Sequence, residues 1–291
     1  MRNRVGTRRA IGIAPARVMS ALPRITSRQN PRVKDAVRLR DGRARQRQGR
    51  FVIDGAREII RAVESGIKCS EAFVCDELLH SAESRAAVEA VRRAGAELLE
   101  VSAEVFEKLQ FGQRADGIVV VALAPERRLE MLQLPAEPLV AVLVGVEKPG
   151  NIGAILRSAD AAGVDAVIIA DGGTDMFNPN TIRASLGTVF RQNVCDATSA
   201  ETIQWLGQRG LKIIAARPDA ERLYTEVDLH GGAAIVLGSE AAGLSDVWRG
   251  ANVQAVRLPM HGIADSLNVS TTAAVLFYEA LRQQSSSGKR N

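Results

Sequence analysis

The feature that most constrains the fold is a regular alternation of short apolar runs and amphipathic stretches in the C-terminal half of the 291-residue chain. Each apolar run has the length of a strand, and most of the stretches between them have the periodicity of a helix. This pattern is typical of an α/β domain with a mostly parallel sheet, in which ligands bind at the carboxyl ends of the strands. The expected strands are 139–146, 166–169, 211–215, 233–237 and 253–258, and the expected helices are 152–162, 179–187, 199–208 and 266–283.

Two of the expected strands end abruptly in loops with an unusual composition. The run Ala233–Leu237 stops at Gly238, and the run Val253–Leu258 stops at Pro259. Glycine, serine and acid or amide residues follow each run. We expect the two strands to be adjacent, and their loops to form a pocket for a flat polar ligand.

Polar residues in these loops are predicted to lie at helix starts. Glu240 follows the first strand at or near the beginning of a helix, and Ser266, Leu267 and Asn268 begin the final helix. Upstream, Asn151 occupies a position typical of a helix cap, with Arg157 in the first two turns of the same helix.

The N-terminal half predicts a second, smaller α/β unit over residues 25–124, which begins with one helix from Pro31 to about Arg47. Residues 125–138 contain no clear strand and are predicted to form a linker, and the larger domain spans 139–285. Residues 1–24 are predicted to form a disordered basic arm, and residues 286–291 a disordered tail.

The charge of the chain is concentrated at one end. The formal net charge is +5, but residues 1–50 alone carry +13. This asymmetry indicates that one end of the molecule contacts a polyanion, and we favour nucleic acid. The candidate RNA-binding residues are Arg28, Arg32, Lys34, Arg38, Arg40 and Arg45, together with Arg183 in the C-terminal half.

The first twenty or so residues allow three interpretations: a basic arm, an organelle transit peptide, or an extension upstream of a start at Met19. The three cysteines, Cys69, Cys75 and Cys195, form no pair at metal-binding spacing, which favours a reducing cytosol. No apolar run approaches the ~18–20 residues that span a bilayer.

Several site classes fit the sequence poorly. The segment Gly145–Gly150 has the spacing of a phosphate loop, but Asn151-Ile152 replaces the required Lys-Ser/Thr pair. His261 has no second histidine or cysteine at ligand spacing, so a metal site is not expected. A catalytic triad of Ser266, His261 and Asp265 is conceivable, but no G-x-S-x-G elbow carries the serine.

Four motifs in order carry a resemblance to a known family. The segments NIGAILRS, RASLGTVF, IVLGSEAAGL and LPM followed six residues later by SLNVS resemble the signature of the SpoU/TrmH family of the SPOUT class. Members of that family are RNA ribose 2′-O-methyltransferases. Residues 25–124 also resemble, more loosely, the substrate-binding domain attached to members that modify ribosomal RNA.

The resemblance implies a parallel sheet whose C-terminal segments form a deep trefoil knot, a bound S-adenosylmethionine, no metal, and a homodimer. It implies that the Asn151/Arg157 edge works beside the cofactor of the partner. The implied catalytic residues are Asn151, Arg157, Glu240, Ser266 and Asn268. The implied cofactor-binding residues are Leu237, Gly238, Gly243, Leu258, Met260, Ser266 and Leu267.

The resemblance offers Arg157 as the group that activates the ribose hydroxyl. Forming neutral arginine at pH 7 would cost about 8 kcal/mol for a guanidinium pKa of roughly 13. We therefore expect Arg157 to position the hydroxyl and to stabilise developing negative charge.

The N-terminal domain and its charge favour 23S-type ribosomal RNA as substrate. Transfer RNA is the alternative substrate, and a non-catalytic RNA-binding assembly factor is the alternative of another class. Phe111 is the one aromatic candidate for base recognition, although packing in the core is the simpler role. The expected location is the cytoplasm.

Overall fold

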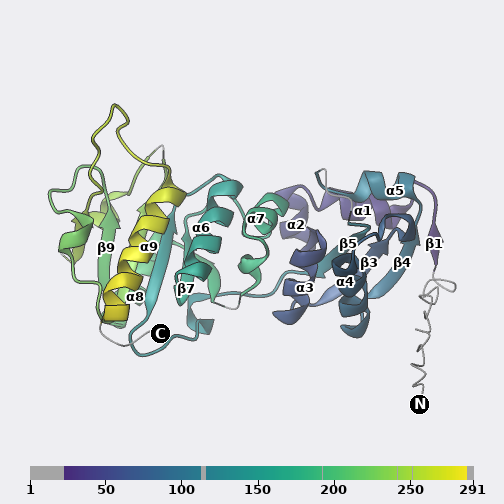
Figure 1. Ribbon diagram of the computed structural model, residues 1–291, viewed down its shortest axis with the longest axis horizontal. Coiled ribbons are helices and arrows are strands. Elements are labelled where there is room, and N and C mark those ends of the chain that lie inside the picture. The colour runs from purple at the N-terminus through teal and green to yellow at the C-terminus, as the bar shows by residue number, and fades with distance from the viewer. Residues whose placement is uncertain (1–22, 113–115, 192, 241, 251, 287–291) are drawn as a thin grey trace, which may run out of the picture.

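The computed structural model describes residues 23–112, 116–191, 193–240, 242–250 and 252–286. Most of the predicted basic arm and of the predicted tail therefore lies outside the described residues. The chain forms two α/β domains that lie side by side along the long axis of the molecule, each built around its own sheet (Figure 1).

The N-terminal domain contains a five-stranded sheet in the order β1-β4-β3-β5-β2. Strands β2 and β3 pair antiparallel with β5, whereas β4 pairs parallel with β3 and β1. The strands are β1 (Arg24–Ile25), β2 (Arg50–Asp54), β3 (Cys69–Val74), β4 (Glu97–Val101) and β5 (Ile118–Leu123). The helices are α1 (Pro31–Arg38), α2 (Gly42–Gln48), α3 (Ala56–Glu64), α4 (Ala82–Arg93) and α5 (Ala103–Leu109).

The C-terminal domain contains a six-stranded sheet in the order β11-β9-β10-β6-β7-β8, and every pairing in it is parallel. The predicted parallel α/β architecture is confirmed, whereas the knot stays a prediction. The strands are β6 (Leu139–Val144), β7 (Ala166–Ala170), β8 (Val194–Ala197), β9 (Lys212–Ala216), β10 (Ala233–Gly238) and β11 (Val253–Val256). The helices are α6 (Pro149–Ala161), α7 (Pro179–Ala184), α8 (Ser199–Gln208) and α9 (Val269–Ser286).

Alternate residues of the central strand β6 pack into two separate cores. Leu139, Ala141 and Leu143 join a core that includes α6 and α9, whereas Val140 and Val142 join the core that includes α8. Helices α6 and α9 therefore cover one face of the sheet, and α8 covers the other. Both faces are buried, which explains why the strands are continuous apolar runs.

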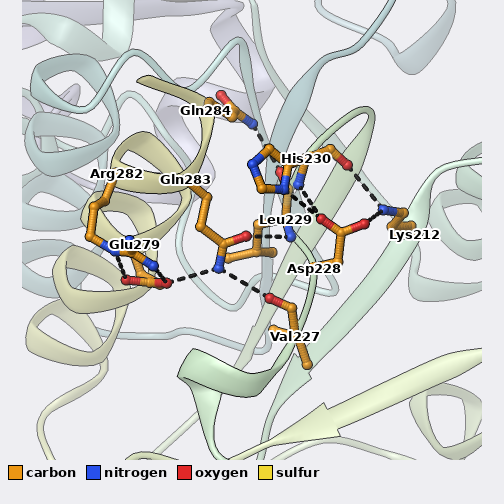
Figure 2. Close-up of polar contacts among 9 residues, drawn as sticks. All are labelled: Lys212, Val227, Asp228, Leu229, His230, Glu279, Arg282, Gln283 and Gln284. Atoms are coloured by element: carbon orange, nitrogen blue, oxygen red, sulfur yellow. Dashed lines mark hydrogen bonds and ion pairs between the residues drawn. The ribbon is translucent and has the colours of Figure 1, made fainter. Parts of the chain in front are cut away.

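The end of α9 is held by a buried glutamine rather than by apolar contacts alone (Figure 2). The Gln283 amide nitrogen donates to the carbonyl oxygen of Val227 at 3.1 Å, and its amide oxygen accepts from the Leu229 backbone N–H at 2.8 Å. The same nitrogen donates to Glu279 at 2.8 Å. These bonds tie α9 to the segment that leads into β10.

The predicted single helix from Pro31 to Arg47 is wrong, because the chain forms α1 and α2 with a break at residues 39–41. Asp41 caps α2 by accepting a hydrogen bond from the Ala44 backbone N–H. Arg45 donates to the carbonyl oxygens of Leu39 and Arg40, which the break leaves without helical partners. A buried arginine thus stabilises the break.

Further boundaries differ from the predictions. Strand β8 was not predicted, because it is a four-residue edge strand that includes the exposed Asp196. Strand β1 begins at Arg24 and α9 reaches Ser286, so the last residue of the predicted arm and the first of the predicted tail belong to regular structure.

The predicted linker is fixed to the C-terminal domain. Leu129 and Leu132 are buried in the core on the α8 side of the sheet. Arg127 donates to the carbonyl oxygens of Val189 and Phe190, at 3.0 and 2.8 Å. Burial lowers the pKa of Arg127 to about 10.

The two domains meet at the side of α7. Phe51 of β2 stacks on Phe177 with a ring separation of 4.4 Å, and both belong to one continuous core. Arg45 of α2 pairs with Asp175 at 2.6 Å. The N-terminal domain is therefore packed directly against the segment that precedes α7.

Candidate active site

A cleft of about 300 Å³ lies at the carboxyl ends of β9, β10 and β11. All seven residues predicted to bind the cofactor line it. They are Leu237, Gly238, Gly243, Leu258, Met260, Ser266 and Leu267. The lining combines apolar side chains with polar ones, as expected of a site for a small organic ligand.

The prediction that the strands ending at Gly238 and Leu258 are adjacent is wrong, because β9 lies between β10 and β11. The end of β9 therefore contributes Ala216, Arg217 and Pro218 to the cleft, which the prediction missed. The available signal was the sequence Arg217-Pro218-Asp219 directly after a predicted strand. Arg217 is oriented by Asp219, to which it donates at 3.0 and 2.6 Å.

Position 238 requires glycine, because the backbone of Gly243 lies too close to leave room for a side chain. A Cβ atom at this position would lie 2.6 Å from the carbonyl carbon and oxygen of Gly243. The chain turns tightly here, since the Gly243 N–H donates to the carbonyl oxygen of Ser239 at 3.0 Å and Gly243 has a φ of 64°. The predicted helix start at Glu240 is wrong: Glu240 follows Ser239 in this turn.

Three of the predicted catalytic side chains are hydrogen-bonded to one another at the mouth of the cleft. The Asn268 side-chain nitrogen donates to Glu240 Oε1 at 2.6 Å and to Asn151 Oδ1 at 3.2 Å. The Asn151 side-chain nitrogen donates to the same Glu240 oxygen at 3.2 Å. Three segments far apart in the chain therefore meet at one carboxylate.

The helix ends determine how the two amides are presented. Asn268 precedes α9 and accepts hydrogen bonds from the N–H and hydroxyl of Ser270, so α9 begins at Val269 and not at Ser266. Asn151 lies in the first turn of α6, after the cap at Lys148. The predicted capping role of Asn151 is therefore wrong, and its side chain is available to Glu240.

A lysine that the sequence did not single out completes the network. Lys148 Nζ contacts Glu240 Oε2 at 2.5 Å. The Lys148 ammonium is the main cause that lowers the pKa of Glu240, and the Asn151 hydrogen bond contributes. Glu240 is therefore a carboxylate at neutral pH and acts as an acceptor for both amides.

Ser266 lies in the lining of the cleft and is exposed. In the part of the chain that the structure describes, no hydrogen bond joins it to His261 or Asp265. A serine hydrolase needs such bonds to activate its nucleophile, so this geometry gives no support to a triad.

Arg157 lies on α6, the helix that also carries Asn151, but its side chain is exposed and does not line the cleft. Among the described residues it has no hydrogen-bond or ion-pair partner. One copy of the chain therefore does not bring Arg157 to the cleft.

Four of the predicted RNA-binding arginines are engaged within the protein. Arg32 pairs with Glu71 and Glu97. Arg45 is only 5% exposed and serves the helix break and the domain contact. Its guanidinium is not available to RNA, because it is buried against two carbonyl oxygens and Asp175. Arg40 donates to the carbonyl oxygens of residues 108, 109 and 110.

Arg183, the fourth of these arginines, lies beside Phe111 at the junction of the domains. Its guanidinium carbon is 5.9 Å from the ring centre, and that of Arg40 is 5.8 Å away. Phe111 also donates its N–H to Asp54, a buried carboxyl whose pKa burial raises to about 6.

The remaining candidates are exposed. Arg28, Lys34 and Arg38 lie on the surface, and Arg38 forms only a surface pair with Asp35 at 3.2 Å. The structure adds two exposed arginines of α2, Arg43 and Arg47, which the prediction did not include.

No group of three or more histidine, cysteine or acidic side chains suited to a metal ion occurs among the residues that the structure describes. The helices in the described ranges are likewise too short or too polar to span a bilayer.

The fold and the cleft define a parallel α/β domain with a ligand site at its strand ends, joined to a second, smaller α/β domain. Residues 138–278 match the family model described as SpoU rRNA Methylase family, and residues 30–120 match an MRM3-like substrate binding domain. The chain belongs to the SpoU rRNA methylase family.

Individual relatives agree with this assignment. The chain is 34% identical to the 23S rRNA (guanosine-2'-O-)-methyltransferase RlmB of Xylella fastidiosa, over 77% of this chain and 95% of the relative. A crystal structure of an RNA 2'-O ribose methyltransferase has 45% identity and a TM-score of 0.78, over 90% of this chain and 99% of that one. The SpoU methyltransferase AviRb from Streptomyces viridochromogenes, solved with the cofactor AdoMet, has 27% identity and a TM-score of 0.81, over 89% and 99%.

Proposed function

We propose that this protein transfers a methyl group from S-adenosylmethionine to a ribose 2′-OH of 23S-type ribosomal RNA. The observation that carries the proposal is the Asn151–Glu240–Asn268 network at the mouth of a cleft lined by every predicted cofactor-binding residue. The relatives named above include a 23S rRNA (guanosine-2'-O-)-methyltransferase and an RNA 2'-O ribose methyltransferase.

The lining of the cleft fits S-adenosylmethionine. Leu237, Leu258 and Leu267 offer apolar contacts to a flat purine, and the turn at Gly238 exposes backbone groups to a ribose. The carboxylate of Asp265 suits the ammonium group of the cofactor. When bound, the cofactor supplies an electrophilic methyl group on a sulfonium.

The polar residues then act on the RNA. Asn151 and Asn268, oriented by Glu240, hold the ribose in line with the methyl group, and this alignment lowers the entropic barrier of transfer. Arg157 donates to the attacking oxygen and stabilises the negative charge that develops there as the hydroxyl proton passes to solvent water.

We propose that the protein is a homodimer, in which Arg157 of one copy works beside the cofactor cleft of the other. Exposure of Arg157 away from the cleft of its own chain supports this arrangement. Arg157→Ala and Gly238→Ala proteins would be mixed under conditions that exchange subunits, at an S-adenosylmethionine concentration at which neither variant alone has measurable activity. If Arg157 acts across the interface, random mixing restores about a quarter of the wild-type rate, since half of the dimers gain one intact site. If each active site is built within one chain, mixing the two variants would restore no activity.

We propose the cytoplasm as the location and the exposed basic residues Arg28, Lys34, Arg38, Arg43 and Arg47 as phosphate contacts. To test the function, the protein is incubated with methyl-labelled S-adenosylmethionine and either 23S rRNA or transfer RNA, each isolated from cells that lack the protein. Label in the ribosomal pool alone supports the proposal. Label only in transfer RNA would show that ribosomal RNA is not the substrate. If neither RNA is labelled, the proposed activity on free RNA is wrong.

A further inference from the structure

We propose that Lys148 is a positioning residue for methyl transfer, which acts through the carboxylate of Glu240 to orient the Asn151 and Asn268 amides. The proposal rests on the proposed function and adds to it a residue that none of the motifs includes. Lys148 itself does not line the cofactor cleft.

The sheet topology brings Lys148 and Glu240 together. Strands β6 and β10 are paired and in register, and both end at the pair Val144 and Gly238. From β6 the chain continues outward through β7 and β8, whereas β10, β9 and β11 lie on the other side. The crevice between β6 and β10 is therefore a topological switch point, where α/β proteins bind ligands. Lys148 follows one of these strands and Glu240 the other.

The two oxygens of Glu240 have separate tasks. Oε1 accepts hydrogen bonds from both amides, at 3.2 Å from Asn151 and 2.6 Å from Asn268. Oε2 contacts Lys148 at 2.5 Å. The terminal torsion of glutamate is soft, so a carboxylate without the lysine would rotate more freely. Lys148 therefore keeps Oε1 directed at the amides.

The amide that depends most on this contact is Asn151. Asn268 is already oriented by its hydrogen bonds from Ser270 at the start of α9. Asn151 has only Glu240 and Asn268 as side-chain partners in the described structure. Loss of Lys148 is thus transmitted through Glu240 to Asn151, which shares α6 with Arg157.

Other charges at the cleft do not replace Lys148. Arg217 and Arg257 line it, but Arg217 is held by Asp219 and neither donates to Glu240 in the described residues. Asp265 lines it with a charge of the opposite sign to Lys148. On α9, the backbone at Val269 adds a weaker contribution that lowers the pKa of Glu240.

The test compares Lys148→Met, Lys148→Arg and a matched control, Lys212→Met. Lys212 pairs with Asp228 at the amino end of β9, the opposite end of that strand from the cleft (Figure 2). The control removes an exposed lysine–carboxylate pair of the same domain. Its activity, and the affinity of all three variants for S-adenosylmethionine, should match wild type.

The pH dependence separates positioning from simple RNA contact. Lys148 lowers the pKa of Glu240, so without it the carboxylate gains its proton at a higher pH, and the acid limb of kcat moves upward. In Lys148→Met we expect the acid limb of kcat to move to higher pH, and kcat at neutral pH to fall roughly 3–10-fold because the amides are less well oriented. Lys148→Arg should leave the acid limb of kcat at its wild-type pH, because arginine keeps the positive charge. If Lys148→Met raises the KM for RNA equally at every pH and leaves the acid limb of kcat unchanged, the proposal is wrong. Lys148 would then be a phosphate contact.

A measurement without catalysis keeps this proposal distinct from the proposed function. The Glu240 side-chain carbon is titrated by NMR, and the side-chain amide signals of Asn151 and Asn268 are followed in the same samples. Lys148→Met should raise the Glu240 pKa and shift the Asn151 amide, whereas Lys212→Met should change neither. Unchanged signals would overturn the role of Lys148 even in an active enzyme. Shifted signals in a protein that transfers no methyl group would uphold the coupling and overturn the proposed function.

Discussion

The two domains use their polar residues in opposite ways. In the C-terminal domain, Asn151, Glu240 and Asn268 lie up to 117 positions apart in the chain and meet in one hydrogen-bonded network. In the N-terminal domain, the predicted RNA-binding residues come from one short basic segment but have different environments. Arg45 is buried and Arg32 is held in a cluster with two glutamates, while Arg38 stays on the surface.

The difference reflects how each prediction was made. The motif residues share a geometric constraint, because each follows a strand or begins a helix at one edge of a parallel sheet. The basic residues share only a charge, and a charge count does not distinguish a guanidinium that binds phosphate from one that binds carbonyl oxygens.

The largest expected effect is on Arg157. Arg157→Ala should lower kcat about 10²–10³-fold, since it removes a charged donor from the transition state. Cofactor affinity should be unchanged, because Arg157 is proposed to contact the RNA hydroxyl and not the cofactor. Arg209→Ala, which removes an exposed arginine of the opposite sheet face, is the matched control. Steady-state kinetics measure both, and equal rates for the two variants would remove Arg157 from the site.

The next effect tests the backbone of the cleft. Gly238→Ala places a methyl group 2.6 Å from the Gly243 backbone, so the turn must open. We expect S-adenosylmethionine to bind at least about 10-fold more weakly, measured by calorimetry, since a misplaced loop costs more than ~1.4 kcal/mol. Gly207→Ala on α8 meets no atom within 4 Å and should leave binding unchanged. Equal affinities would show that the turn does not shape the ligand site.

A smaller effect separates stability from RNA binding on α2. Arg45→Ala removes the ion pair of a buried guanidinium with the partly exposed carboxylate of Asp175, and two hydrogen bonds to carbonyl oxygens. It should lower the free energy of unfolding by about 2–4 kcal/mol. Arg47→Ala, two residues along the same helix and exposed, should change it by less than about 0.5 kcal/mol. Urea unfolding measures both. Equal stabilities would mean that the break between α1 and α2 does not depend on Arg45.

The smallest effect is on RNA affinity. Arg47→Ala and Arg38→Ala should each weaken binding at low salt and make the slope of log Kd against log salt shallower by about 0.7–0.9, the contribution of one phosphate contact. Arg32→Ala should change the slope little, because its charge is already matched by Glu71 and Glu97. A larger change for Arg32 than for Arg38 would reverse this assignment.

The sequence predicts the parallel domain well, because its buried strands are uninterrupted apolar runs. It misses β8, whose four residues include an exposed aspartate, and although it predicts the strand β9, it misses that β9 lies between the two loop-bearing strands. Sheet order depends on long-range pairing, which periodicity does not report. For the same reason Lys148 was overlooked, since its contact with Glu240 joins residues 92 positions apart.

The most direct test of the account is the chemical position of the transferred methyl group. After reaction with 23S rRNA, the RNA is digested to nucleosides and analysed by mass spectrometry. The account predicts one 2′-O-methylated nucleoside, formed about 10²–10³-fold more slowly when Arg157→Ala replaces the wild-type protein. A methyl group on a base, or a ribose methyl group formed equally by Arg157→Ala, would contradict it.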